Sequence, residues 1–350
     1  MNTSIHLSNV LVVSIGTKLI CDSILRIDQT TDGKINIISE RLTIGQLSAL
    51  ITYGIQILTA LMMISMIMVM LVMSLESVNR ISEVLVEEPT IKNPENPIMA
   101  LDDGSVEFKD VDFKYSENAQ RNALENINLT IKSGQFIGIL GGTGSGKTSL
   151  VNLISRLYDI TDGSLTVGGH DVKDYDLITL RDSVSVVLQK NVLFSGTIRS
   201  NMQWGDPNAT DEEITRALSI AQIAEINRET QGVLDLKVEQ GGTNFSGGQK
   251  QRLCIARAIL KKPKIVILDD STSAVDTKTY KLIRKGLKED LPHMTKIVIA
   301  QRISSIEDAD QIIIMNNGKI DQIGTHEELI KTNKIYQDVY NTQSALGGGK

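Results

Sequence analysis

The segment at residues 141–148 constrains the fold of this chain more than any other. It reads Gly-Gly-Thr-Gly-Ser-Gly-Lys-Thr and matches the pattern G-x-x-x-x-G-K-[ST] at every fixed position. The apolar run at residues 136–140 precedes it, and a helical apolar pattern follows from Ser149. A strand, a glycine-rich loop and a helix in this order predict a phosphate-binding loop, because backbone N–H groups and the helix N-terminus bind anionic oxygens. We therefore expect the chain to bind a nucleoside triphosphate.

Each residue type in this loop has a physical reason. Glycines let the backbone curl around the phosphates, a lysine reaches the β- and γ-phosphate oxygens, and a hydroxyl can bind Mg²⁺. The lysine is Lys147 and the hydroxyl is that of Thr148. The expected nucleotide-binding residues of the loop are Gly141, Gly142, Thr143, Gly144, Ser145, Gly146, Lys147 and Thr148.

Length and charge limit the classes of protein to which the chain can belong. Its 350 residues allow about two domains of ~150 residues. The net charge is −6 and no basic block occurs, so we expect no nucleic acid among its partners. The two cysteines, Cys21 and Cys254, are too far apart in the sequence to suggest a zinc motif or a disulfide framework.

An uncharged stretch near the N-terminus predicts a membrane-crossing helix. No charged residue occurs at residues 42–75, and a helix of this length would extend about 50 Å, beyond the ~30 Å of a bilayer core. A second apolar stretch at residues 9–25 contains Lys18 and Asp22, so it is a weaker candidate. The first residues carry no basic region and no small-residue cleavage site follows, which argues against a signal peptide.

Composition changes after this stretch and marks a domain boundary. Helical spacing of apolar residues continues to residue 85 in a more polar sequence, and Pro89, Pro94 and Pro97 then interrupt it. We expect a partial transmembrane domain at residues 1–88 with its last helix at about 42–85, a linker at 89–104, and a nucleotide-binding domain at 105–345. In that domain short β-type runs alternate with helical ones, which predicts an α/β fold. The runs interpreted as strands are 106–108, 136–140, 184–188, 265–268, 297–300 and 312–315.

Further motifs narrow the nucleotide-binding prediction. Residues 265–268 form an apolar run that ends in Asp269, a Walker B arrangement in which the carboxylate holds Mg²⁺. Gln189 follows another predicted strand, residues 245–249 read Phe-Ser-Gly-Gly-Gln, and residues 273–276 read Ser-Ala-Val-Asp. Each motif alone is weak evidence, but their order and spacing together are specific.

With these motifs the chain, from about residue 9 to its end, resembles the C-terminal part of a half-transporter of the ATP-binding cassette (ABC) exporter family, multidrug or lipid exporter type. The resemblance implies a P-loop NTPase cassette with a mixed sheet core and a helical subdomain, preceded by a transmembrane segment. It implies ATP and Mg²⁺ as cofactors, with Mg²⁺ near Thr148, Gln189 and Asp269. It also implies an adenine-stacking role for Tyr115, a Q-loop role for Gln189, and a signature motif made of Ser246, Gly247, Gly248 and Gln249.

Two positions depart from the family pattern at the catalytic step. After Asp269 the family usually has Glu as the base, whereas this chain has Asp270, and Gln301 stands where a His usually lies near the γ-phosphate. A carboxylate shorter by one methylene is misplaced by over 1 Å, which can cost ~10²-fold in rate, and Gln cannot shuttle a proton. The pattern predicts a degenerate site, with Asp270, Gln301 and Gln189 as the catalytic positions and weak hydrolysis there.

The family architecture pairs two cassettes head to tail, so that the signature of one closes over the nucleotide of the other. The resemblance therefore implies an ATP-binding exporter subunit that donates its signature to a competent site on a partner half-transporter, in a heterodimer or, alternatively, a homodimer. A half-transporter has six membrane helices, and the first four are expected to be missing, in a fragment, a truncated product or a split gene. We expect the cell membrane as location, a cytoplasmic cassette, and a transported substrate that the sequence does not identify.

Two other functions stay open from the sequence. One is a nucleotide-gated regulatory or structural subunit that dimerises on ATP without export. The other is a soluble cassette ATPase of DNA repair or translation, which the uncharged stretch and the acidic net charge disfavour.

Overall fold

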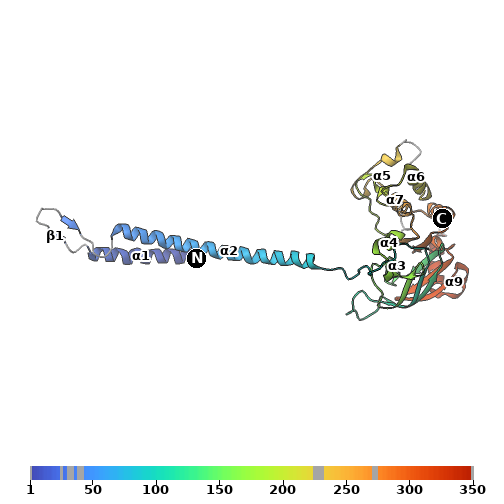
Figure 1. Ribbon diagram of the computed structural model, residues 1–350, viewed down its shortest axis with the longest axis horizontal. Coiled ribbons are helices and arrows are strands. Elements are labelled where there is room, and N and C mark those ends of the chain that lie inside the picture. The colour runs from blue at the N-terminus through green and yellow to red at the C-terminus, as the bar shows by residue number, and fades with distance from the viewer. Residues whose placement is uncertain are drawn as a thin grey trace. The chain divides into compact units, whose positions relative to one another are not determined.

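The computed structural model describes residues 2–23, 27–29, 35–37, 43–223, 232–269 and 275–347. The chain forms two compact units, Met1–Pro89 and Thr90–Lys350 (Figure 1). The expected positions Asp270, Ser273 and Ala274 lie outside the described residues, as does the first residue of the uncharged stretch, Leu42.

The first unit is a pair of helices. It contains α1 (Asn2–Ser23), β1 (Ile27–Gln29), β2 (Ile35–Ile37) and α2 (Ile44–Val86), and α1 lies beside α2. Gly16 of α1 allows this approach, because a Cβ there would lie 2.2 Å from Leu47 Cδ1. The small side chain thus lets the two helices pack closely.

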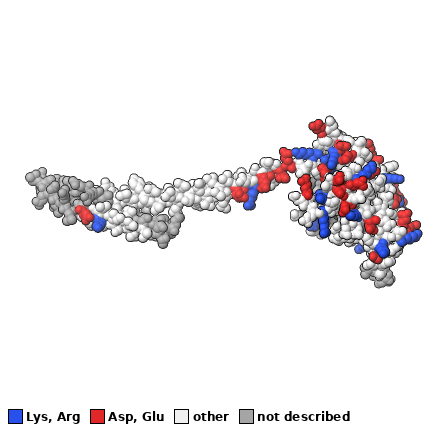
Figure 2. Space-filling view, turned by 90° about the horizontal axis from the view of Figure 1, so that it is seen from below, with Lys and Arg blue, Asp and Glu red and all other residues white. Residues whose placement is uncertain are grey.

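Helix α2 is long enough and apolar enough to cross a membrane, and among the described residues it is the one helix that meets both criteria. Thr43 and Gln46 form a capping box at its start, and it ends at Val86, shortly before Pro89. None of the side chains described in α2 is buried, and Figure 2 shows uncharged side chains along most of its length, with charged ones gathered at its C-terminal end. The predicted helix at 42–85 therefore corresponds to α2.

The second unit has a six-stranded sheet at its centre, in the order β14-β13-β5-β12-β11-β8, with β14 alone antiparallel to its neighbour. These strands are β5 (Phe136–Gly141), β8 (Val184–Val187), β11 (Ile265–Asp269), β12 (Thr295–Ile299), β13 (Gln311–Asn316) and β14 (Lys319–Gly324). A four-stranded antiparallel sheet of order β4-β3-β6-β7 consists of β3 (Val106–Phe113), β4 (Leu124–Ile131), β6 (Asp162–Val167) and β7 (His170–Asp171). The predicted α/β class with a mixed sheet core is confirmed.

Two of the predicted strands extend one residue beyond the C-terminal end of the observed strand. Leu188 was expected in a strand, but β8 ends at Val187 and Leu188 is exposed. Ala300 was also expected in a strand, but β12 ends at Ile299. In both cases an apolar residue follows the last paired position, so hydropathy alone extended the strand too far.

Some helices cover the faces of the sheets, and others form a separate helical subdomain. They are α3 (Lys147–Ile154), α4 (Leu177–Ser183), α5 (Ile198–Gln203), α6 (Asp211–Ile220), α7 (Gly247–Leu260), α8 (Thr277–Asp290), α9 (His326–Thr332) and α10 (Lys334–Gly347). Helix α7 packs against both α5 and α6, which together form the helical subdomain (Figure 1). A short strand pair, β9 (Gly196–Thr197) with β10 (Lys237–Val238), lies beside them.

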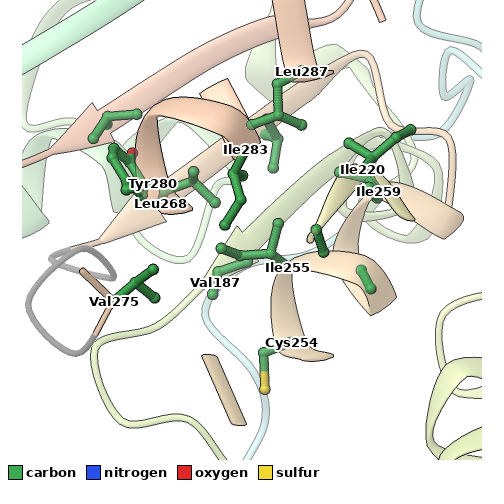
Figure 3. Packing of buried hydrophobic residues seen from close by; sticks show 14 of the residues in the cluster. Val187, Ile220, Cys254, Ile255, Ile259, Leu268, Val275, Tyr280, Ile283 and Leu287 are labelled. Atoms are coloured by element: carbon green, nitrogen blue, oxygen red, sulfur yellow. The ribbon is translucent and has the colours of Figure 1, made fainter. Parts of the chain in front are cut away.

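Alternate residues of the central strands enter two different cores. Ile265 and Ile267 of β11 pack with α3 and the antiparallel sheet, whereas Val266 and Leu268 pack with α7 and α8. Figure 3 shows the second core, where Ile255 of α7 and apolar residues of α8 lie near Leu268. A strand buried on both faces has a continuous apolar sequence, which explains why these runs were recognisable.

Candidate nucleotide-binding site

The central sheet brings several of the expected site residues to one edge. Strands β5, β12, β11 and β8 are adjacent and parallel, and Asp269 pairs with Ile299 while Leu268 pairs with Val187. The phosphate-binding loop, Gln301 and Gln189 follow β5, β12 and β8 respectively. Because the carboxyl ends of parallel strands meet at one edge, positions far apart in the sequence converge there.

The loop after β5 has a backbone that requires glycine at two points. Gly144 has φ +77° and Gly146 has φ +96°, and a Cβ on Gly146 would lie 2.8 Å from Leu124 Cδ2. Residue Gly146 is also the N-cap of α3, and no described side chain caps that helix. The first turn of α3 therefore presents backbone donors of the kind that bind phosphate.

Lys147 folds back over this loop. Its Nζ donates to Gly141 O at 2.9 Å and to Gly142 O at 2.7 Å, and it lies 3.4 Å from Ser145 Oγ. These acceptors are neutral oxygens, so a phosphate oxygen would be a stronger partner for the ammonium group. The arrangement fits a lysine that binds the phosphates of a nucleotide.

The hydroxyl and carboxylate expected to hold Mg²⁺ lie together. Thr148 Oγ1 donates to Asp269 Oδ2 at 3.2 Å, and Asp269 is only 9% exposed. Burial raises the pKa of Asp269, while Thr148 and the charge of Lys147 act in the opposite direction. A buried carboxylate beside a hydroxyl supplies hard oxygen ligands and gains from a nearby cation, so these residues fit Mg²⁺. A bound Mg²⁺ would neutralise phosphate charge.

Tyr115 lies beside the helix that follows the loop. Its OH and Ser149 Oγ of α3 are 2.7 Å apart, and its ring contacts Phe113 and Tyr158 edge-on, with centroids 4.8 and 5.0 Å away. The ring is 53% exposed and lies just past the end of β3. The tyrosine is therefore held near the nucleotide loop with an exposed aromatic surface.

The two glutamine positions occupy the ends of neighbouring elements. Gln189 lies in an exposed segment two residues after β8. Gln301 lies two residues after β12, and its carbonyl accepts a hydrogen bond from Gln343 Nε2 at 2.7 Å. Gln343 Oε1 also accepts from Ile303 N at 3.0 Å, so α10 fixes the segment that carries Gln301.

The signature residues begin a helix of the helical subdomain. Ser246 is the N-cap of α7: its Oγ accepts from Gln249 N at 3.2 Å, and its N–H donates to Gln249 Oε1 at 2.9 Å. Gly247 and Gly248 form the first turn of α7. The N-terminus of this helix therefore presents backbone N–H groups in a capped, regular conformation.

Sequence reasoning missed two contributors to this site. Ser149 anchors Tyr115, and Gln343 clamps the segment around Gln301, although it lies 42 positions away. Neither residue belongs to a recognisable motif, and only the packing of α3 and α10 reveals them.

We predict that Asp269→Asn changes the pH dependence of stability and weakens Mg²⁺ binding. Because the folded-state pKa of Asp269 is raised above its usual value, stability present at low pH is lost as pH rises through that pKa. Asn does not ionise, so the melting temperature of the Mg²⁺-free variant should rise relative to that of the wild type as pH increases through the raised pKa of Asp269. Stabilisation by Mg-ATP should need on the order of 10- to 100-fold more Mg²⁺. Melting curves across pH, with and without Mg-ATP, test both statements; a constant difference would contradict the first.

Comparisons with known proteins agree with this geometry. Residues 124–273 match the family model described as ABC transporter. An uncharacterized ABC transporter ATP-binding protein of Mycobacterium bovis is 39% identical over 317 residues, covering 89% of this chain and 54% of that protein. An ATP-dependent lipid A-core flippase of Desulfotalea psychrophila is 39% identical over 270 residues, covering 77% of this chain and 47% of the flippase.

A solved structure extends the similarity over most of the chain. The structure of a bacterial Atm1-family ABC exporter with ATP bound matches with a TM-score of 0.73 and 27% identity, covering 98% of this chain and 59% of that one. The chain thus spans about half the length of the curated relatives it matches.

Proposed function

Because this chain carries an ABC transporter ATP-binding domain, we propose that it is the ATP-binding subunit of a membrane exporter, in which α2 crosses the membrane and ATP hydrolysis drives transport. The observation that carries the proposal is the convergence of the phosphate-binding loop, Thr148 and Asp269 at one sheet edge in a chain that also contains α2. Similarity to an ATP-dependent flippase and to an ATP-bound exporter supports the same class.

The site of this chain is proposed to be the degenerate one of a pair. Lys147, Thr148 and Asp269 supply the groups for Mg-ATP binding, whereas Asp270 and Gln301 replace the usual base and histidine. The chain would retain ATP and offer the N-terminus of α7, with Ser246, Gly247 and Gly248, to nucleotide held by a partner half-transporter. An uneven pair of sites favours a heterodimer over a homodimer.

A groove next to Gln189 supports coupling to membrane helices. A cavity of about 580 Å³ is lined by residues that follow β8 and by α7, among them Leu188, Phe194 and Trp204. These three side chains are 58, 46 and 68% exposed, and Phe194 and Trp204 pack at a centroid distance of 4.8 Å. An exposed apolar groove of this kind suits a cytosolic loop of a transmembrane domain. Nucleotide state sensed at Gln189 would then reach the membrane through this contact.

We predict that charges placed within the uncharged stretch release the chain from membranes. Ile55→Lys with Met66→Lys divides the stretch into segments shorter than the roughly 20 residues that a span needs. Each lysine near the centre costs about 2.5–3.5 kcal/mol of insertion free energy. After a carbonate wash, the wild type should stay in the membrane fraction and the double variant should move largely to the supernatant.

The matched control for this experiment lies in the same helix. Val78→Lys with Val84→Lys adds the same charge to the polar C-terminal part of α2 and should leave the chain in the membrane. A wild-type chain that washes off completely would favour a soluble cassette ATPase.

A further inference from the structure

A second cavity lies away from the nucleotide site. It has a volume of about 260 Å³ and lies among α8, the amino-terminal part of β12 and the segment around residues 307–308. Its apolar lining comes from Phe136, Leu287 and Val298. The sheet edge that carries the phosphate-binding loop lies at the other end of β12, so this cavity is separate from the site described above.

Two buried donors in the lining of this cavity are unsatisfied. Tyr280 is 2% exposed and Arg284 is 7% exposed, and neither the Tyr280 OH nor Arg284 Nε has a hydrogen-bond partner among the described residues. Arg284 Nη1 donates to Ser305 O at 2.9 Å and pairs with Asp308, and its guanidinium carbon lies 5.6 Å from the Tyr280 ring centroid. Figure 3 shows Tyr280 and Leu287 on α8. Buried donors normally have hydrogen-bond acceptors, so we expect a bound ligand to supply the acceptors here.

The charge of the lining favours an anion as that acceptor. Its charged residues are Lys281, Arg284, Lys285, Lys288, Lys296, Glu289, Glu307 and Asp308. Lys281 pairs with Glu307 at 3.1 Å, and Lys285 lies 3.9 Å from Glu289. Arg284 pairs with Asp308. The two remaining lysines, Lys288 and Lys296, have no carboxylate within 4.0 Å among the described residues. The lining therefore has more cationic than anionic side chains, and Asp310 is a further carboxylate that acts on Lys296.

Lys296 is the cation that burial affects most. It is 4% exposed, and its Nζ donates to Leu291 O at 2.6 Å. Burial lowers its pKa to about 8; Lys288 adds to this effect and Asp310 opposes it. An anion next to this ammonium group would offset the cost of burying it.

We propose that this cavity binds a small organic carboxylate with an apolar body. The two carboxylate oxygens would accept hydrogen bonds from the Tyr280 OH and Arg284 Nε, beside the ammonium group of Lys296. The apolar body would contact Phe136, Leu287 and Val298. Two separate donors and a cation match the two oxygens and the charge of a carboxylate, and the apolar wall selects against inorganic anions.

The test is ligand-observed ¹⁹F NMR on the full chain in lipid nanodiscs, with 4-fluorophenylacetate as the probe and empty nanodiscs subtracted. We expect saturable binding that 2-(4-fluorophenyl)ethanol, a neutral compound of similar shape, does not show. Tyr280→Phe removes only the hydroxyl and should weaken binding at least fivefold, and Lys296→Met should do the same. Tyr175→Phe is the matched control, because Tyr175 is also fully buried but lies outside this cavity, where its OH donates to Val167 O.

Three outcomes would overturn the proposal. They are an absence of saturable binding to the wild type, equal affinity in Tyr280→Phe, and binding of the alcohol as tightly as the carboxylate. Displacement by inorganic phosphate at equal concentration would contradict the role of the apolar wall. Excess Mg-ATP should leave the ¹⁹F signal unchanged, so failure here is distinguishable from failure of the proposed nucleotide site.

Discussion

Lys147→Ala is expected to weaken ATP binding by the purified chain by about 100-fold or more. In the structure, Lys147 Nζ donates to the neutral carbonyl oxygens of Gly141 and Gly142 and lies 3.4 Å from Ser145 Oγ, and a nucleotide would offer it charged phosphate oxygens instead. Each hydrogen bond to a charged group contributes about 1.5–3 kcal/mol, and two of them exceed the ~2.7 kcal/mol that corresponds to a factor of 100. Equilibrium titration with a fluorescent ATP analogue in Mg²⁺ measures the loss.

The control for this variant is another lysine-to-alanine change on the same unit. Lys262 is exposed and pairs with Glu213 at 2.5 Å, far from the loop in sequence, so Lys262→Ala should leave ATP affinity within about twofold. Both variants should keep the cooperative melting of the wild type without nucleotide. Unchanged ATP affinity in Lys147→Ala would mean that residues 141–148 do not hold the triphosphate.

Motifs with strong local requirements were predictable from the sequence. Residues 141–148 need glycine at positive φ, and Asp269 follows a strand buried on both faces, so composition and periodicity indicated both. Thr148 and Asp269 were both expected near Mg²⁺, and in the structure their side chains form a hydrogen bond. The predicted α/β core and the predicted long apolar helix are also confirmed, and both were predictable because they too depend on composition and periodicity.

Features that depend on tertiary contacts were not predictable. The order of the central strands places β12 between β5 and β11, although β12 follows both in the chain, and no local signal determines that order. The clamp of Gln343 on the Gln301 segment and the unsatisfied hydroxyl of Tyr280 also arise only when distant elements pack together. Side-chain chemistry at such positions is set by neighbours that are remote in sequence.

The roles proposed for Ser246 and Asp270 lead to opposite expectations in the assembled transporter. Ser246 starts α7, so its position and the N–H groups of Gly247 and Gly248 would face a phosphate presented by the opposite cassette. Asp270 would serve only the chain's own site, where hydrolysis is expected to be weak. The comparison of these two residues therefore tests which of the two sites turns ATP over.

Ser246→Arg is expected to reduce ATP hydrolysis by the assembled heterodimer by ~10²-fold or more, whereas Asp270→Ala should change it less than about threefold. Loss of one donor aimed at developing charge typically costs ~10²–10³-fold, and a bulky side chain would also keep the phosphate away from Gly247 and Gly248. Since Ser246 also caps α7, part of the loss could come from the cap, which is worth about 1 kcal/mol. Thr210→Arg removes the equivalent capping box of α6 in the same subdomain and should leave hydrolysis nearly unchanged. All variants are compared at saturating ATP in membranes with matched amounts of both subunits. If Asp270→Ala proves the more damaging change, hydrolysis occurs at this chain's own site, and the two cassettes have the opposite roles.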